Sequence, residues 1–282
     1  MRFPSHVHRE SFATSVEVCY GCTTNDSGTE MRDAPTLTAD LLLKAYALGV
    51  FPMAQRREGS DIYFVSPDER GIMPLDRFHL SRRLARTIRS NRFSVRVDTD
   101  FASVIRACAA PAQGRQESWI NEEIVSLYTN LYARGFAHSV ECWRNGRLVG
   151  GLYGVQLGAV FFGESMFSRE RDASKVALVH LVARLKCGGF SLLDAQFMTS
   201  HLAQFGAISI PRDDYLVLLE EAIAGSADFA NAGAYCPEPS GNSGAASLAP
   251  ASGEVVLTGA VEATTGATWP GWFVLQLITQ TS

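Results

Sequence analysis

The stretch that decides the fold is AHSVECWRNGRLVGGLYGVQLGAVFFGESMF, residues 137–167. Asn145-Gly146 separates two runs rich in strand-forming residues, and this dipeptide is typical of the type I′ turn that closes a β-hairpin. Gly158 marks a second turn, after which residues 159–167 form another apolar run. We therefore predict three consecutive antiparallel strands.

The pattern changes directly after these strands. A helix is predicted from about Asp172 to Cys187, ended by Gly188-Gly189, and a strand follows at 190–197. Three strands, a helix, a strand and further helices is the order of an acetyltransferase-like α+β fold with a mixed sheet. The remaining helices of this catalytic domain, which we place at residues 101–224, are predicted at 101–109, 121–135, 199–205 and 213–224.

The residues before this domain predict a small N-terminal α/β domain at 36–100. A capped helix starts after Thr38 and ends at Gly49. Strands at 62–65 and 93–97 flank a basic helix at 79–90. Residues 1–35 have no period and are expected to be a disordered leader, so that either Met1 or Met31 could be the start. Residues 225–282 read as a Gly/Ala/Ser-rich linker and tail, with an added strand at 272–278.

Composition excludes several classes of protein. The chain of 282 residues has no apolar run near the roughly 20 residues that a spanning helix needs, and its first thirty residues lack the apolar core of a secretory signal. We expect a cytoplasmic protein that does not enter a membrane.

The six cysteines show no regular spacing and are expected to be thiols. Cys19 and Cys22 form one C-x-x-C without a second ligand pair, so no metal is predicted.

Positive charge is concentrated in one segment of an acidic protein. Seven arginines and no acid lie between Arg77 and Arg96, so that the rest of the chain carries a net charge of −4 − 7 = −11. Arg82, Arg86 and Arg89 are spaced i, i+4, i+7, which places them on one helical face. This pattern favours contact with nucleic-acid phosphates, and the alternative is a solvated helix face.

Two strands carry the candidate chemistry. The period of two places Asp194 and Gln196 together on one face of their strand, opposite Leu193, Ala195 and Phe197. The same rule groups Glu164 with Phe162 and Met166, which indicates an apolar pocket with one polar group. The alternative for each polar residue is a hydrogen-bonded place in the core.

Eight short blocks spread over residues 36–224 resemble one known family. They include Ser66-Pro67-Asp68, Trp119-Ile120-Asn121, Gly163-Glu164-Ser165-Met166-Phe167-Ser168 and Leu193-Asp194-Ala195-Gln196; the others are Ala45-Tyr46 to Pro52, Ala137–Glu141, Gly150–Gly154 and Ala173-Ser174-Lys175. In this order they are similar to the signature blocks of leucyl/phenylalanyl-tRNA–protein transferases, and agreement of all eight by chance is negligible.

The resemblance implies an aminoacyltransferase that moves Leu or Phe, and Met weakly, from charged tRNA to proteins with an N-terminal Lys or Arg, marking them for N-degron degradation. It implies that Asp194 and Gln196 are catalytic. Substrate-binding residues would be Leu152, Glu164, Met166, Leu181, Trp119 and Tyr46, with Trp119 beside the terminal adenosine. Arg82, Arg86 and Arg89 would contact the tRNA.

The chain departs from the family pattern at two places. Met53 stands where many members have Trp in F-P-W, and Phe64-Val65 replaces the two Trp of W-W-S-P. A coenzyme-A-dependent N-acetyltransferase is the alternative activity, although residues 168–172 lack a Gly-rich loop for pyrophosphate. A non-catalytic RNA-binding module is a further alternative, in which Asp194, Gln196 and Glu164 would have no purpose.

Overall fold

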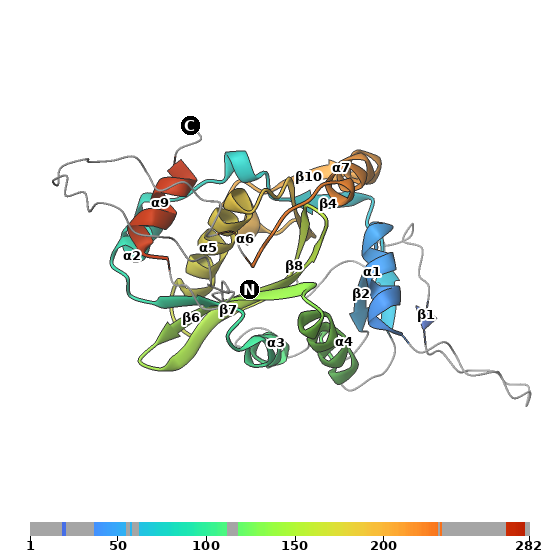
Figure 1. Ribbon diagram of the computed structural model, residues 1–282, viewed down its shortest axis with the longest axis horizontal. Helices are drawn as coiled ribbons and strands as arrows, with labels where there is room; N and C mark the ends of the chain where they lie inside the picture. Colours follow the sequence, from blue (N-terminus) through green and yellow to red (C-terminus); the bar gives the residue numbers. More distant parts are fainter. Residues whose placement is uncertain are drawn as a thin grey trace, which may run out of the picture.

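The computed structural model of the protein describes residues 19–20, 37–54, 57, 62–111, 118–230, 232 and 269–279, and every structural statement concerns these residues. Figure 1 shows a twisted central sheet with helices on both faces. The prediction of an α+β fold with a mixed sheet is confirmed. The finer likeness to acetyltransferases stays a prediction.

The central sheet has seven strands in the order β10-β4-β9-β8-β7-β6-β5. All neighbours are antiparallel except β8 and β9, which are parallel and are joined by a helical crossover. The strands are β4 (Glu69–Ile72), β5 (Ser94–Val97), β6 (Ala137–Arg144), β7 (Arg147–Leu157), β8 (Val160–Ser168), β9 (Leu192–Gln196) and β10 (Ile208–Pro211).

The hairpin β6–β7 forms as predicted. Asn145 and Gly146 both have positive φ, at 51° and 72°, as a type I′ turn requires. Gly158, which joins β7 to β8, has a φ of 59°, and a Cβ there would lie 2.4 Å from the carbonyl oxygen of Ile223. Only glycine satisfies both conditions, so the second predicted turn is confirmed as well.

Helices cover the two faces of the sheet and create two apolar clusters (Figure 1). On one face lie α1 (Ala39–Ala47), α3 (Phe101–Ala109), α4 (Glu122–Ala133) and α7 (Arg212–Ala224). On the other lie α2 (Arg82–Arg89), α5 (Ala173–Cys187), α6 (Ser200–Ala203) and α9 (Gly271–Thr279), with the short 3-10 helix η2 (Leu75–Arg77) near α5. Alternating strand residues point to one cluster or the other: Phe161 packs towards α5, and Phe162 packs towards α1.

The N-terminal segment contributes to two sheets. β2 (Phe51–Ala54) and β3 (Ile62–Val65) pair with each other, and β1 (Cys19–Tyr20) extends this small sheet. β4 and β5, in contrast, are strands of the large sheet, and α2 packs on α5 and α9. The predicted strand at 93–97 is therefore present, but it pairs with β6. The domain limits at residues 35, 100 and 224 stay a prediction.

Two sequence predictions are wrong. Residues 272–278 belong to the helix α9, because Gly271, Val274, Leu275 and Ile278 are buried at the i, i+3, i+4, i+7 spacing of a helix. The apolar run alone did not distinguish this from a strand. Cys187 forms a disulfide, so its predicted thiol state is wrong, whereas Cys108 and Cys142 are not disulfide-bonded, as expected.

His138 and Glu141 are buried polar side chains that are hydrogen-bonded to specific partners. His138 shares a 2.8 Å hydrogen bond through Nδ1 with Asp98 and stacks on Phe229, as expected for a structural histidine. Glu141 accepts hydrogen bonds from the backbone of Thr99 and Asp100, directly before α3.

No helix within the described ranges is long and apolar enough to cross a membrane.

Candidate active site

A small cavity opens where β8 and β9 diverge. The two strands pair only from Val160 to Phe162 against Leu192 to Asp194. Beyond this point each strand carries one extra residue relative to its other neighbour, namely Glu164 in β8 and Ala195 in β9. Such bulges bend a strand and redirect its side chains. They leave a cavity of about 90 Å³ between the strands.

The cavity wall is mostly apolar and aromatic. Phe51, Met53, Trp119, Met166 and Phe197 line it, together with the polar side chains of Glu164, Ser165, Gln196 and Thr199. Trp119 precedes α4, and Phe51 and Met53 lie in β2, so the wall is assembled from the small sheet as well as the large one. An apolar pocket with few polar groups is the usual form of a small-molecule site.

Glu164 is held at the cavity wall by three donors. Tyr46 and Tyr128 donate to its two carboxylate oxygens at 2.7 Å and 3.0 Å, and Nε2 of Gln196 donates to Oε1 at 2.8 Å. The two tyrosine hydroxyl oxygens also lie in close contact with each other. Removal from water raises the pKa of Glu164 to about 7, although the tyrosine hydrogen bonds oppose this rise. A carboxylate with a pKa near neutrality is suited to proton transfer.

Gln196 has a strained backbone conformation, and the buried side chain of Asp194 lies next to it. Its φ is 59°, in the left-handed region that a residue with a side chain rarely adopts. Its backbone N–H donates to Oδ1 of Asp194 at 2.7 Å. Asp194 is fully buried and forms a 2.6 Å ion pair with Arg70, which is 1% exposed. Strain of this kind persists where the surrounding structure fixes it.

The structure brings together four of the predicted site residues. Trp119, Glu164, Met166 and Gln196 line one cavity, with Tyr46 behind Glu164 and Asp194 behind Gln196. Leu152 in β7 and Leu181 in α5 are buried in the apolar cluster between the sheet and α5, and Leu152 lies opposite Met166 in the register of β7 and β8. Neither is among the residues that line this cavity in the described part of the chain.

The predicted grouping of strand faces is partly wrong. Asp194 and Gln196 are neighbours, as predicted. Phe162 and Met166, however, pack in opposite clusters, because the bulge at Glu164 reverses the alternation along β8. Phe197 likewise leaves the face of Leu193 after the left-handed turn at Gln196 and packs edge-on against Phe51. A strict period of two cannot anticipate a bulge.

Three residues of the site were missed by the sequence reasoning. Tyr128 donates to Glu164 from α4, whereas Arg70 and Tyr215 both bind Asp194. Arg70 lies in the strand Glu69–Ile72, which was not predicted because a Gly and two charged residues obscure its pattern. In the sequence, an arginine such as Arg70 would indicate a site only if the carboxylate that it pairs with were already known.

The helix α2, which carries the arginine face, lies at the opposite end of the molecule from α1 and β2 (Figure 1). Arg82, Arg86 and Arg89 are exposed and form no ion pair with another described residue, while Leu84 and Ile88 are buried beneath them. Arg83 and Arg92 do pair, with Asp172 and Glu170. The amphipathic helix is thus confirmed, and its three outward arginines keep their charge available to a ligand.

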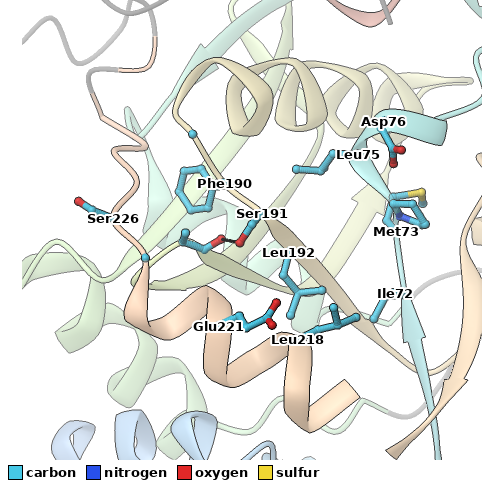
Figure 2. A pocket seen from close by; sticks show the side chains of 14 residues that line it. Ile72, Met73, Leu75, Asp76, Phe190, Ser191, Leu192, Leu218, Glu221 and Ser226 are labelled. Carbon is cyan, nitrogen blue, oxygen red and sulfur yellow. Dashed lines mark hydrogen bonds between the residues drawn. The ribbon is translucent and has the colours of Figure 1, made fainter. Parts of the chain in front are cut away.

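A larger cavity of about 700 Å³ lies elsewhere, between the end of β4, the start of β9 and α7 (Figure 2). Figure 2 shows mainly apolar side chains such as Phe190, Leu192 and Leu218, with the carboxylates of Asp76 and Glu221 well apart. None of the predicted site residues lines it.

No group of three or more His, Cys, Asp or Glu side chains that could hold a metal occurs among the described residues.

Comparisons with known proteins point to one family. The family model "Leucyl/phenylalanyl-tRNA protein transferase" matches residues 72–220, and the model of its N-terminal domain matches residues 36–68. The chain is similar to proteins named leucyl/phenylalanyl-tRNA–protein transferase. It is 60% identical over 200 residues to that of Phenylobacterium zucineum (71% of this chain, 90% of the relative) and 58% identical over 199 residues to that of Caulobacter vibrioides strain NA1000 / CB15N (71% and 91%).

The chain belongs to the leucyl/phenylalanyl-tRNA–protein transferase family. Its departures from the family pattern fall in different places in the structure. Met53, in place of Trp, lines the cavity, so the indole is missing from the wall itself. Phe64 and Val65 are buried in β3, 5% and 3% exposed, and belong to the core beneath α1. The second departure from the transferase pattern therefore concerns packing of the core rather than the cavity.

Proposed function

We propose that this protein transfers Leu or Phe, and Met weakly, from charged tRNA to the N-terminal Lys or Arg of acceptor proteins. The observation that carries the proposal is the hydrogen-bonded pair Glu164 and Gln196 on the wall of an apolar cavity beside Trp119. The family membership supports it. Transfer of this kind marks a protein for N-degron degradation in the cytoplasm, where we place this enzyme.

The reaction needs orientation and one proton transfer. The α-amine of the acceptor attacks the carbonyl carbon of the aminoacyl ester; the bond to the ribose oxygen breaks, the amine loses a proton and the ribose oxygen gains one. The ester is already activated, so that no cofactor is required. Holding the two reactants at near-attack geometry can supply about 7–11 kcal/mol of the barrier.

In this scheme Gln196 aims the amine and Glu164 receives its proton. An amide is a very poor base, whereas a carboxylate with a pKa of about 7 can accept a proton at neutral pH. Trp119 stacks on the terminal adenosine, and Met166 contacts the side chain of the donated amino acid, with Leu152 and Leu181 behind it. The outward arginines 82, 86 and 89 bind the tRNA body.

The predicted likeness to acetyltransferases would make coenzyme A an alternative acyl carrier. The loop from Ser168 to Asp172, between β8 and α5, argues against it. Glu170 in this loop is paired with Arg92 at 3.0 Å and Arg144 at 2.7 Å, and Asp172 pairs with Arg83. Residues 168–172 also contain no glycine, so the chain before α5 lacks the Gly-rich loop whose backbone N–H groups would hold a pyrophosphate at the helix N-terminus.

The deciding assay offers labelled leucyl-tRNA and labelled acetyl-CoA in parallel to the full chain, with a peptide beginning with Arg and a matched peptide beginning with Gly. We expect label from leucyl-tRNA on the Arg peptide alone. Transfer from acetyl-CoA would support the alternative, and tRNA binding without transfer to either peptide would contradict the proposed activity.

A further inference from the structure

The carboxylate of Asp194 has no free position for a substrate. Its Oδ1 accepts the backbone N–H of Gln196 at 2.7 Å and Nε of Arg70 at 3.0 Å. Its Oδ2 accepts Nη2 of Arg70 at 2.6 Å and the hydroxyl of Tyr215 at 2.7 Å. A carboxylate has about four acceptor positions, and these four donors occupy them. The side chain is also fully buried and is not part of the cavity wall.

Arg70 is held as firmly as the carboxylate it binds. Its guanidinium lies between the rings of Phe51 and Tyr215, 4.5 Å from each centroid. Nη1 donates to the carbonyl oxygen of Gly49 at 3.0 Å. A side chain at Gly49 would collide with Leu216, since a Cβ there would lie 2.7 Å from its Cδ2. The turn after α1, the start of β2 and α7 therefore all fix one guanidinium.

We propose that Arg70 and Tyr215 are positioning residues for the transfer reaction: they hold Asp194 so that it fixes the backbone of Gln196, and Asp194 does not touch the substrate. This inference rests on the proposed function. It revises the expectation from the family resemblance that Asp194 is itself a catalytic residue. The amide of Gln196 can face Glu164 and the cavity only while its backbone keeps a φ of 59°, and the bond to Oδ1 of Asp194 stabilises that conformation.

Buried ion pairs are costly to break, which makes the choice of variant important. Removing Arg70 would leave a buried, unpaired carboxylate and is expected to unfold the chain. Tyr215→Phe removes one hydrogen bond to Asp194 and keeps the aromatic ring over Arg70. Tyr132→Phe is the matched control, because the Tyr132 hydroxyl bonds the carbonyl oxygen of Asp98, in another part of the protein, at 2.9 Å.

The test is a double-mutant cycle of Tyr215→Phe and Gln196→Ala, measured as kcat and KM for transfer from leucyl-tRNA to a peptide beginning with Arg. Loss of one hydrogen bond to a charged group predicts a fall in kcat of about tenfold for Tyr215→Phe, with little change in either KM. In the Gln196→Ala background the same substitution should change kcat less than about twofold, since its effect passes through Gln196. Tyr132→Phe should leave kcat unchanged.

Amide hydrogen exchange provides a readout that does not depend on activity. The backbone N–H of Gln196 should exchange faster in Tyr215→Phe than in the parent, and Tyr132→Phe should not alter it. Additive losses in the cycle, or a kcat of Tyr215→Phe equal to that of the parent, would overturn the proposal. An inactive parent would instead contradict the proposed function, and the exchange measurement would still test the role of Tyr215.

Discussion

The side-chain amide of Gln196 donates a 2.8 Å hydrogen bond to Oε1 of Glu164 and so joins β9 to β8 at the point where the two strands separate. A carboxylate can only accept, so the amide must present its nitrogen to Glu164. The carbonyl oxygen of Gln196 is thereby turned away from Glu164 and can accept an N–H of an incoming amine. In the proposed mechanism, Gln196 therefore aims the amine and the adjacent Glu164 accepts its proton.

The first prediction concerns the pH dependence of transfer. The attacking amine, with a pKa of about 7.7–8.0, and Glu164 must both be deprotonated, so log kcat/KM should rise with a slope of about two below pH 7. Glu164→Gln should lower kcat/KM about 100-fold at pH 8 and reduce that slope to about one. Steady-state transfer between pH 5.5 and 9 measures both quantities.

Glu220→Gln on α7 is the control, because it removes the same charge from an exposed position. It should keep the parent profile. A slope of about two that persists in Glu164→Gln would assign the second proton to another group.

The raised pKa of Glu164 should also make the free energy of unfolding depend on pH in a direction that can be predicted. Its pKa is higher in the folded protein than the 4.5 of the free side chain, so the folded state binds more protons between pH 4.5 and 7. The contribution of Glu164 to the free energy of unfolding therefore falls as pH rises through this window. Urea unfolding of the parent and Glu164→Gln should diverge from pH 5 to pH 7, with the variant gaining stability relative to the parent. Parallel curves would show that Glu164 keeps an ordinary pKa.

Sequence patterns identified the central strands, α5 and the position of Glu164, because the type I′ turn and the helical period are local properties. They failed where long-range packing decides. Arg70 and Asp194 are 124 positions apart, and nothing in the short strand around Arg70 reveals that its guanidinium will be buried. The bulge at Glu164 depends on pairing with β7, so the opposite positions of Phe162 and Met166 could not be read from alternation alone.

The outward arginines of α2 predict salt-dependent binding. Replacing Arg82, Arg86 and Arg89 together with Gln should weaken tRNA binding and lower the slope of log K against log salt by about 0.7–0.9 for each phosphate that is no longer bound. The control replaces three exposed arginines outside α2, Arg57, Arg106 and Arg147, with Gln, which removes the same charge. Equal changes in both triple variants would indicate a net-charge effect rather than a binding face.

The helix α9 should contribute to the stability of the fold. Leu275 is 7% exposed and packs in the cluster of α2 and α5, so Leu275→Ala should lower the free energy of unfolding by about 2–5 kcal/mol. Leu48→Ala, at a side chain that is 73% exposed, should change it by less than about 0.5 kcal/mol. Denaturant unfolding compares the two, and equal small effects would show that α9 does not pack on the domain in solution.

The last prediction concerns the choice of donor amino acid. Met166 lines the cavity with Trp119 and Phe197, and Leu152 lies opposite it in the neighbouring strand. If this wall contacts the side chain of the donated residue, γ-branched, unbranched and aromatic side chains should fit. A β-branched side chain such as Ile or Val should collide with the wall near the ester, because its branch lies next to the ester and its χ1 angle is restricted.

Discrimination in an apolar pocket is limited, since one methylene is worth only about 1–3 kcal/mol. Met166→Ala should therefore reduce the differences in kcat/KM among Leu, Phe and Met donors, and the variant should still transfer all three. The measurement is kcat/KM with tRNAs charged with Leu, Phe, Met, Ile and Val, for the parent, Met166→Ala and the control Met198→Ala. Met198 is 37% exposed and is not among the residues that line the cavity in the described part of the chain, so its truncation should leave the ranking intact. An identical ranking in the parent and Met166→Ala would remove Met166 from the pocket, because a wall that contacts the donor cannot lose a side chain without changing which donors fit.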